Sequence, residues 1–197
     1  MSGADAPAKR MIPPPHDFLV FAYGSLMWNP GFPHLEVRPA RLIGYHRTFC
    51  LYSEHYRGTS ERPGLVLGLD RGGSCLGRAY KIAAAAGPEV ARYLDERELL
   101  GGAYDPRWVQ IRFEDGRRAS AYAYVIDRAC PHYAGRLELD AIAEIIAHAA
   151  GARGSNLDYL VNTVRHLDEL GIAESALHEV LERVQRRLAQ PAPESGG

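Results

Sequence analysis

Cysteine is scarce in this chain, and its three copies lie far apart. Cys50, Cys75 and Cys130 form no C-x-x-C pair. Disulfide frameworks and zinc sites are built from closely or regularly spaced cysteines, so neither is expected here. The scarcity fits a reducing compartment, and we expect a cytoplasmic protein.

Other absences exclude whole classes of partner. No apolar run approaches the roughly 20 residues that a membrane-spanning helix needs, and the first 17 residues lack the apolar core of a signal peptide. The formal net charge is −1 at pH 7, so no overall charge attracts the chain to nucleic acid or to an anionic membrane. The sequence also lacks a G-x-x-x-x-G-K phosphate loop, and its histidines lack metal-binding spacing. We therefore expect no nucleic-acid or membrane partner.

The length of 197 residues, 46% of them hydrophobic, predicts one domain with a sizeable core. Residues 1–16 are rich in proline and small residues, which predicts a disordered leader. Residues 17–189 should form the single domain. Residues 190–197 should form a flexible tail.

Strand patterns dominate the first two thirds of the domain and helical patterns the last third, which indicates the α+β class. We expect a hairpin of residues 65–69 and 75–82 around Asp70–Gly73, and a second of residues 108–113 and 120–126 around Asp115-Gly116. Helices are expected over 139–149, 157–170 and 177–188. Ser155 and Asp158 can begin the second of these. Arg183, Arg186 and Arg187 are interpreted as a solvated face.

The stretch Phe18–Trp28 combines a core strand with a tight turn. Residues 18–22 are all apolar, and Gly24-Ser25 interrupts them, which predicts a buried strand that ends abruptly. A glycine there lets a ligand approach the bare backbone, and consecutive N–H groups of a turn can bind an anion. An ordinary tight turn explains the same pattern, so both interpretations stay open.

The segment from Pro88 to about Leu100 has helical spacing, with Gly101-Gly102 as its expected end. At about 100° per residue, the apolar stripe contains Val90, Ala91, Tyr93, Leu94 and Leu100. The opposite arc contains Glu89, Arg92, Asp95 and Glu96. Glu98 falls inside the apolar stripe, with Arg97 beside it.

A carboxylate on an apolar face needs a reason, because burying it without a partner costs several kcal/mol or raises its pKa. Three explanations remain open for Glu98. It pairs with Arg97 or another buried cation; it lies at a frayed helix end that water reaches; or it faces a cavity as a general base with a raised pKa.

Several motifs occur together, in this order, in one known family. They are Tyr23-Gly24-Ser25-Leu26-Met27-Trp28, Gly44-Tyr45 with Arg47, His55-Tyr56-Arg57-Gly58-Thr59 with Pro63-Gly64, Gly77-Arg78-Ala79-Tyr80, Tyr93-Leu94-Asp95-Glu96-Arg97-Glu98, Gly102-Ala103-Tyr104 and Gly154-Ser155-Asn156-Leu157-Asp158-Tyr159-Leu160. Over residues 18–181 the chain resembles the ChaC family of glutathione-specific γ-glutamylcyclotransferases. It departs from the family's pattern at Asp95-Glu96, which make the helix more acidic, and in the loop between Tyr52 and Arg57.

The resemblance implies a γ-glutamylcyclotransferase-like α+β fold, with a small mixed β-barrel, packed helices and a helical C-terminal third. It also implies a cytosolic lyase that converts glutathione to 5-oxoproline and cysteinylglycine without a metal or an organic cofactor. The family's catalytic glutamate corresponds to Glu98. Its substrate-binding loop corresponds to Ala22, Tyr23, Gly24, Ser25 and Leu26.

The residue types suit this chemistry. The substrate's own α-amine attacks its γ-carbonyl, so the enzyme needs a base and an oxyanion site but no nucleophile of its own. Glu98 is the expected general acid and base, and the N–H groups of residues 24–26 are expected to bind the α-carboxylate or the oxyanion. Tyr104 and Tyr124 are expected as wall or hydrogen-bonding residues of the substrate site.

Two alternatives share the same residues. One is a cyclotransferase for other γ-glutamyl peptides or γ-glutamylamines, which only a substrate panel separates from the first. The other is a non-catalytic protein that binds small carboxylates, although a buried Glu98 would not help it to bind an anion.

Overall fold

The computed structural model describes residues 10–99 and 102–189. They divide into two compact units, each made of two segments of chain. We call the described parts of residues 1–48 and 67–133 the barrel unit, and those of residues 49–66 and 134–197 the helical unit. Most of the expected leader and the whole expected tail lie outside the described residues, and the single domain over 17–189 stays a prediction.

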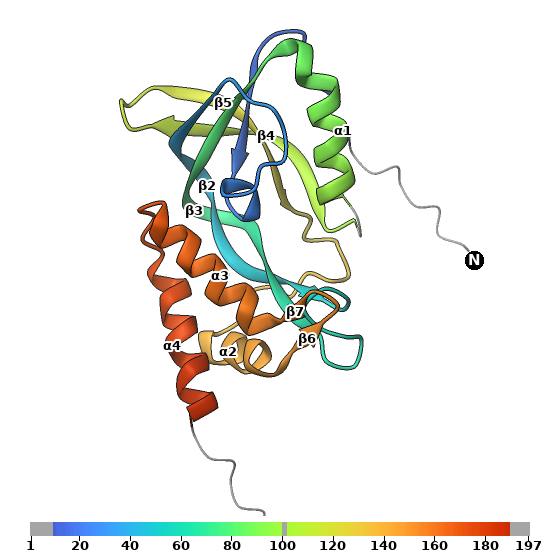
Figure 1. The fold of residues 1–197 in the computed structure, drawn as a ribbon, viewed down its shortest axis with the longest axis vertical. Helices are drawn as coiled ribbons and strands as arrows, with labels where there is room; N and C mark the ends of the chain where they lie inside the picture. The colour runs from blue at the N-terminus through green and yellow to red at the C-terminus, as the bar shows by residue number, and fades with distance from the viewer. Residues whose placement is uncertain (1–9, 100–101, 190–197) are drawn as a thin grey trace, which may run out of the picture. The chain divides into compact units, whose positions relative to one another are not determined.

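Five strands close into a barrel (Figure 1). They are β1 (Phe18–Ala22), β2 (Glu36–Ser53), β3 (Gly64–Ile82), β4 (Tyr104–Phe113) and β5 (Arg118–Ile126). Their order around the barrel is β1-β3-β2-β4-β5. β1 runs parallel to β5, whereas β1 with β3, β2 with β4 and β4 with β5 are antiparallel pairs. The barrel is therefore mixed, and the expected α+β class is confirmed.

Side chains fill the interior of the barrel. The buried cluster includes Phe21, Leu42, Leu69, Ala79, Ile111, Phe113, Ala121, Ala123 and Val125. Alternate residues of a strand point to the same face, which is why positions two apart recur in this set. Small residues on β5 face larger ones on the other strands, as the interior of a five-stranded barrel requires. Because the interior is occupied, the ends of the strands are the places where a ligand can bind.

The two expected hairpins have different outcomes. The hairpin of β4 and β5 is confirmed, and Gly116 in its turn has a φ of +83°. The hairpin around Asp70–Gly73 is wrong, because β3 runs without interruption through these residues. The neighbouring strand β2 holds it there: a ring nitrogen of His46 lies 3.1 Å from the Gly72 carbonyl oxygen, and Arg41 donates to Ser74 at 3.0 Å.

Three short elements complete the barrel unit: η1 (Ser25–Met27), η2 (Ala84–Ala86) and α1 (Gly87–Glu98). Val90, Ala91 and Leu94 of α1 are buried, as the apolar stripe predicts. The helix ends at Glu98, and Leu100 and Gly101, where its end was expected, lie outside the described residues. Met11 is 5% exposed, and its N–H donates to Asp95 of α1. Contacts with the barrel unit thus begin before the expected domain boundary at residue 17.

The helical unit contains α2 (Leu139–His148), α3 (Asn156–Glu169) and α4 (Ser175–Ala189), with the two-residue strands β6 (Ala150–Gly151) and β7 (Gly154–Ser155) between the first two helices. The three helices pack against one another (Figure 1). Ser155 caps α3 by accepting the N–H of Asp158 at 3.0 Å, so this predicted helix start is confirmed. No helix in the described part of the chain is long and apolar enough to cross a membrane.

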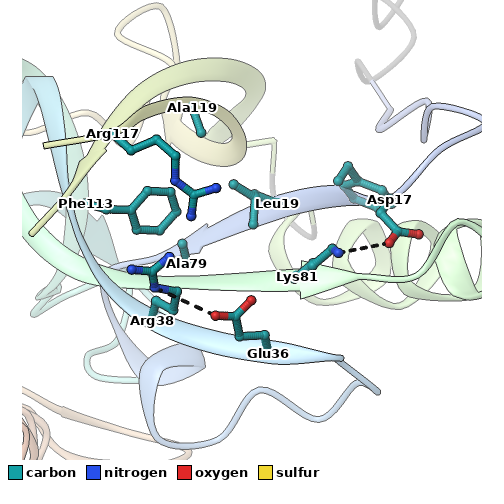
Figure 2. A pocket seen from close by; sticks show the side chains of 10 residues that line it. Asp17, Leu19, Glu36, Arg38, Ala79, Lys81, Phe113, Arg117 and Ala119 are labelled. Atoms are coloured by element: carbon teal, nitrogen blue, oxygen red, sulfur yellow. Dashed lines mark ion pairs between the residues drawn. The ribbon is translucent and has the colours of Figure 1, made fainter. Parts of the chain in front are cut away.

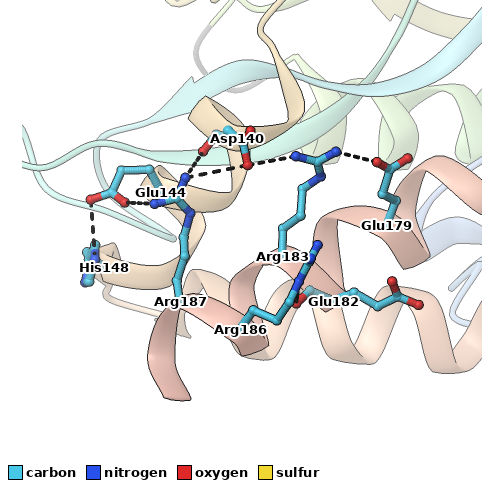
Figure 3. Close-up of polar contacts among 8 residues, drawn as sticks. All are labelled: Asp140, Glu144, His148, Glu179, Glu182, Arg183, Arg186 and Arg187. Atoms are coloured by element: carbon cyan, nitrogen blue, oxygen red, sulfur yellow. Dashed lines mark hydrogen bonds and ion pairs between the residues drawn. The ribbon is translucent and has the colours of Figure 1, made fainter. Parts of the chain in front are cut away.

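Two arginines of α4 join it to α2 (Figure 3). Arg183 pairs with Asp140 at 2.8 Å and also with Glu179 on its own helix. Arg187 pairs with Glu144 at 2.8 Å, and Glu144 in turn lies 3.4 Å from His148. The interpretation of these two arginines as a solvated face did not include their partners on α2, although the paired groups remain in contact with solvent. Single surface pairs contribute little, but the shared carboxylates make this set a network.

Asn156 fixes the start of β3 within the helical unit, and replacing it should destabilise the fold. Its side chain is fully buried, accepts the N–H of Leu65 at 2.6 Å and donates to the Leu65 carbonyl at 2.8 Å. Asn156→Ala leaves both backbone groups without their partner, and urea denaturation should show a loss of about 2 to 3 kcal/mol. Asn162→Ala, an exposed position on the same helix, should change stability by less than about 0.5 kcal/mol. Equal effects of the two variants would contradict this account.

Candidate active site

The loop that follows β1 presents open backbone. β1 ends at Ala22, and the Gly24 carbonyl accepts the N–H of Met27 at 2.9 Å to close the turn of η1. A Cβ atom built on Gly24 would meet no atom within 4 Å, so open space lies over this residue. Within the described residues, the N–H groups of Ser25 and Leu26 donate to no other group. These are the N–H groups that the first turn of a helix leaves unpaired.

The carbonyl side of the loop is held by β2 and β3. Arg47 of β2 is 6% exposed and donates from Nε to the Tyr23 carbonyl at 2.6 Å. The Tyr80 hydroxyl of β3 donates to the carbonyls of Leu26 and Met27 at 3.1 and 2.8 Å. With its acceptors engaged by buried donors, the loop is rigid and keeps its N–H groups for another partner.

Close packing of two strands sets the position of the loop. A Cβ atom on Gly77 of β3 would collide with the Ala22 carbonyl oxygen and would lie 2.6 Å from the ring of Phe21. Only glycine permits this approach of β3 to the end of β1.

Glu98 is the last residue of α1, and its side chain is 18% exposed. Burial raises the pKa of its carboxyl, and the positive charge of Arg97 opposes that rise without cancelling it. A carboxylate in such a setting is a stronger base than an exposed one.

The Arg97 guanidinium joins Glu98 to the loop. Its Nε lies 3.3 Å from a Glu98 carboxylate oxygen, and one Nη donates to the Ser25 hydroxyl oxygen at 2.7 Å. The other Nη donates to the Tyr93 hydroxyl at 2.9 Å and to the Asn29 carbonyl at 3.0 Å. One planar group therefore contacts both the acid and the loop, and the two predicted parts of the site lie together.

These contacts bear on the three explanations of Glu98. The ion pair with Arg97 exists, and Glu98 also lies at the end of its helix. Neither feature explains the raised pKa of Glu98, because a neighbouring cation and contact with water both favour the ionised carboxylate. A role as a general base is the explanation that uses this property, and it stays a prediction.

Comparison with known proteins decides the family. A family model described as ChaC-like protein matches residues 18–187. The chain belongs to the ChaC-like family. The glutathione-specific γ-glutamylcyclotransferase of Escherichia coli (strain K12) is 36% identical over 175 residues, which cover 89% of this chain and 76% of that relative. Glutathione-specific γ-glutamylcyclotransferase 1 of Mus musculus is 34% identical over 151 residues, which cover 75% of this chain and 68% of the relative.

A solved structure shares the fold of this ChaC-like protein. The crystal structure of a γ-glutamyl cyclotransferase specific to glutathione from yeast matches with a TM-score of 0.77 and 23% identity, over 87% of this chain and 96% of that one. The expected γ-glutamylcyclotransferase-like fold is thus confirmed.

The two tyrosines expected at the site are held by different partners. Tyr104, the first residue of β4, donates its hydroxyl to the Leu67 carbonyl of β3 at 2.9 Å, and its contact with substrate stays a prediction. Tyr124 of β5 is buried and donates to Asp95 of α1 at 2.8 Å. The expected place of Asp95 on the outer arc is therefore wrong. Its partner on β5 lies on the inner side of the helix.

Sequence analysis of the ChaC-like chain names Arg97 as a possible partner of Glu98, but it missed the contact of Arg97 with Ser25 and that of Arg47 with the Tyr23 carbonyl. Nothing in a single sequence shows which group of a distant loop a guanidinium will reach. The signal that existed was the Arg97-Glu98 pair at the edge of an apolar stripe.

A separate cavity of about 190 Å³ lies elsewhere in the barrel unit (Figure 2). Leu19, Ala79, Phe113 and Ala119 line it with apolar surface, and charged side chains that include Arg38, Lys81 and Arg117 surround them. Neither Glu98 nor any residue of the loop 22–26 lines this cavity. It is distinct from the site built on the loop and α1.

The raised pKa of Glu98 gives a prediction for stability. Folding disfavours the ionised form of Glu98. The contribution of Glu98 to the free energy of unfolding is therefore fully present below its ordinary pKa of 4.5, and it is lost as the pH rises through the raised pKa of the folded protein. Glu98→Gln should therefore raise the urea midpoint relative to the unmodified protein at about pH 8, and the gain should shrink at about pH 4.

Glu96→Gln is the matched control, because Glu96 is exposed on the same helix and pairs only with Arg92. It should show no comparable gain at high pH. A Glu98→Gln midpoint below that of the unmodified protein at about pH 8 would mean that the Arg97 pair outweighs burial.

Proposed function

We propose that this chain is a cytoplasmic γ-glutamylcyclotransferase that cleaves glutathione to 5-oxoproline and cysteinylglycine. The single observation that carries the proposal is the Arg97 guanidinium, which contacts both the buried Glu98 carboxylate and Ser25 of the loop. The names of the curated relatives support the substrate. Cys50, Cys75 and Cys130 are buried and form no disulfide in the described part of the chain, which supports a reducing compartment.

The loop binds the substrate in this proposal. The N–H groups of Ser25 and Leu26, which no other described group uses, face an anionic group of the γ-glutamyl moiety. Open space over Gly24 lets the substrate approach the backbone. Because β2 and β3 hold the carbonyl side of the loop, its donors are in place before the substrate arrives, which is the condition for efficient electrostatic stabilisation.

Glu98 moves the proton. The α-ammonium group of the bound substrate gives a proton to the Glu98 carboxylate, and the resulting amine attacks the γ-carbonyl carbon of the same molecule. The five-membered ring closes and the carbonyl oxygen becomes an oxyanion. The bond to the cysteinyl nitrogen then breaks as Glu98 gives its proton to that nitrogen, and the carbonyl re-forms. The ring nitrogen gives its surplus proton to the freed Glu98 carboxylate, which passes it to the released amine. The enzyme ends the cycle unchanged.

Two effects supply most of the rate. Attack within one molecule is worth effective molarities of about 10⁵ to 10⁸ M once the substrate is bent correctly. General acid–base catalysis contributes roughly 10² to 10⁴. Arg97 serves both effects, because it fixes Glu98 relative to the loop that holds the bent substrate.

The direct test is the formation of 5-oxoproline from glutathione by the purified protein. Glu98→Gln should fold normally and lose at least about a hundredfold in kcat, because its amide cannot accept the substrate's proton. Glu96→Gln should keep nearly full activity, since Glu96 is exposed and pairs with Arg92. Full activity of Glu98→Gln would contradict the mechanism.

A substrate panel tests the specificity. Glutathione should be turned over with a higher kcat/KM than oxidised glutathione, γ-glutamylalanine or a γ-glutamylamine. A preference for one of the others would assign a different γ-glutamyl substrate to the same site. Saturable binding of glutathione without 5-oxoproline would instead indicate a carboxylate-binding protein.

A further inference from the structure

Asp95 is an acid of α1 that the proposed mechanism does not use. It lies three residues before Glu98 and is half-buried. Its carboxylate accepts the hydroxyl of Tyr124 at 2.8 Å and the backbone N–H of Met11 at 3.3 and 3.2 Å to its two oxygens. Among residues 10–99 and 102–189, no Lys, Arg or His pairs with it. Asp95 therefore acts as a hydrogen-bond acceptor rather than as a member of an ion pair.

Asp95 decides where the Tyr124 hydroxyl points. A phenol has one hydrogen to donate, and in this structure it goes to Asp95. Side chains three residues apart on a helix are neighbours, so Tyr124 lies against the side of α1 that also carries Glu98. The negative charge of Glu98 also acts on Tyr124, so without Asp95 we expect the hydroxyl to turn toward that carboxylate.

The surroundings keep the proton on the phenol. Burial, the hydrogen bond to Asp95 and nearby negative charges, Glu98 among them, hold the pKa of Tyr124 above its ordinary value. Burial and the charges of Asp95 and Asp105 raise the pKa of its neighbour Tyr122 to about 12. The charged group that faces Glu98 from its own helix is Arg97. Tyr124 is thus the neutral donor beside the base.

A hydrogen bond donated to the Glu98 carboxylate would make it a weaker base. A hydrogen bond to a carboxylate favours its ionised form and lowers its pKa, and a less basic carboxylate accepts the substrate's proton less readily. The direction of the Tyr124 hydroxyl therefore matters for catalysis.

From this arrangement we infer that Asp95 is a positioning residue: by accepting the hydrogen bond of Tyr124, it keeps that hydroxyl from donating to Glu98 and leaves the Glu98 carboxylate free for the substrate. This inference rests on the proposed function. It concerns one of the two acids by which this helix departs from the usual family pattern.

The experiment follows Glu98 itself. NMR of its side-chain carboxyl carbon in the ligand-free protein gives the titration, and kcat and KM for glutathione are measured across pH. Asp95→Ala should lower the pKa of Glu98 and reduce kcat about tenfold, with KM nearly unchanged. Asp95→Asn keeps an acceptor oxygen and should retain most of the activity. Glu96→Ala, at the exposed neighbouring position, should behave as the unmodified protein.

A second substitution separates positioning from a structural role. Adding Tyr124→Phe to Asp95→Ala should return the Glu98 titration toward that of the unmodified protein, because no hydroxyl remains to turn toward it. Tyr124→Phe alone should leave the titration nearly unchanged. A residue that only stabilised the fold would not be rescued by the loss of a second polar group.

The inference is overturned if Asp95→Ala leaves the Glu98 titration unchanged, or if the double variant titrates like Asp95→Ala. If Asp95→Ala fails to fold, Tyr124→Phe alone decides. A rise in the pKa of Glu98 would mean that the hydroxyl already donates to it and would overturn the inference, and an unchanged value would support it. If Glu98→Gln keeps full activity, the proposed base is wrong, and the ligand-free titrations still decide the role of Asp95.

Discussion

The site depends on one guanidinium. Arg97 reaches from the end of α1 to the Glu98 carboxylate, to the Ser25 hydroxyl and to the Asn29 carbonyl. Arginine suits this task because its nitrogens donate in a fixed plane, so several partners are held in one geometry at once. Without it, α1 would lose its hydrogen bonds to Ser25 and Asn29. Burial and the neighbouring charges then set the basicity of the Glu98 carboxylate that Arg97 holds beside the loop.

Burial and charge act on Glu98 in opposite directions, and burial is the larger effect. This balance gives the carboxylate a dual character. It is held in place by an ion pair, as structural acids are, yet it is kept basic, as catalytic acids are. The same logic applies to its neighbours. Tyr124 remains protonated beside two carboxylates, so the second polar group near the base carries no charge of its own.

The sequence could predict what depends on local pattern. The strand over residues 18–22, the hairpin around Asp115-Gly116, the three C-terminal helices and the place of Glu98 all follow from spacing and from turn residues. The predictions failed where a partner distant in sequence decides. Gly72-Gly73 look like a turn, and both have a positive φ, but strand β3 continues through them beside β2. Asp95 looks like a surface residue, but Tyr124 lies opposite it. No local pattern shows that Asp140 is the partner of Arg183. No local pattern shows which carbonyl oxygens accept hydrogen bonds from Arg47.

The absence of a side chain at Gly77 has a consequence for the diversity of this family. Since β3 packs directly onto the end of β1 at this point, any larger residue would push the two strands apart and displace the loop that follows β1. Substitution of Gly77 is thus constrained by the geometry of the loop after β1, which lies some fifty positions earlier in the sequence. In related chains, another residue at this position would mark a barrel in which the loop after β1 takes a different path.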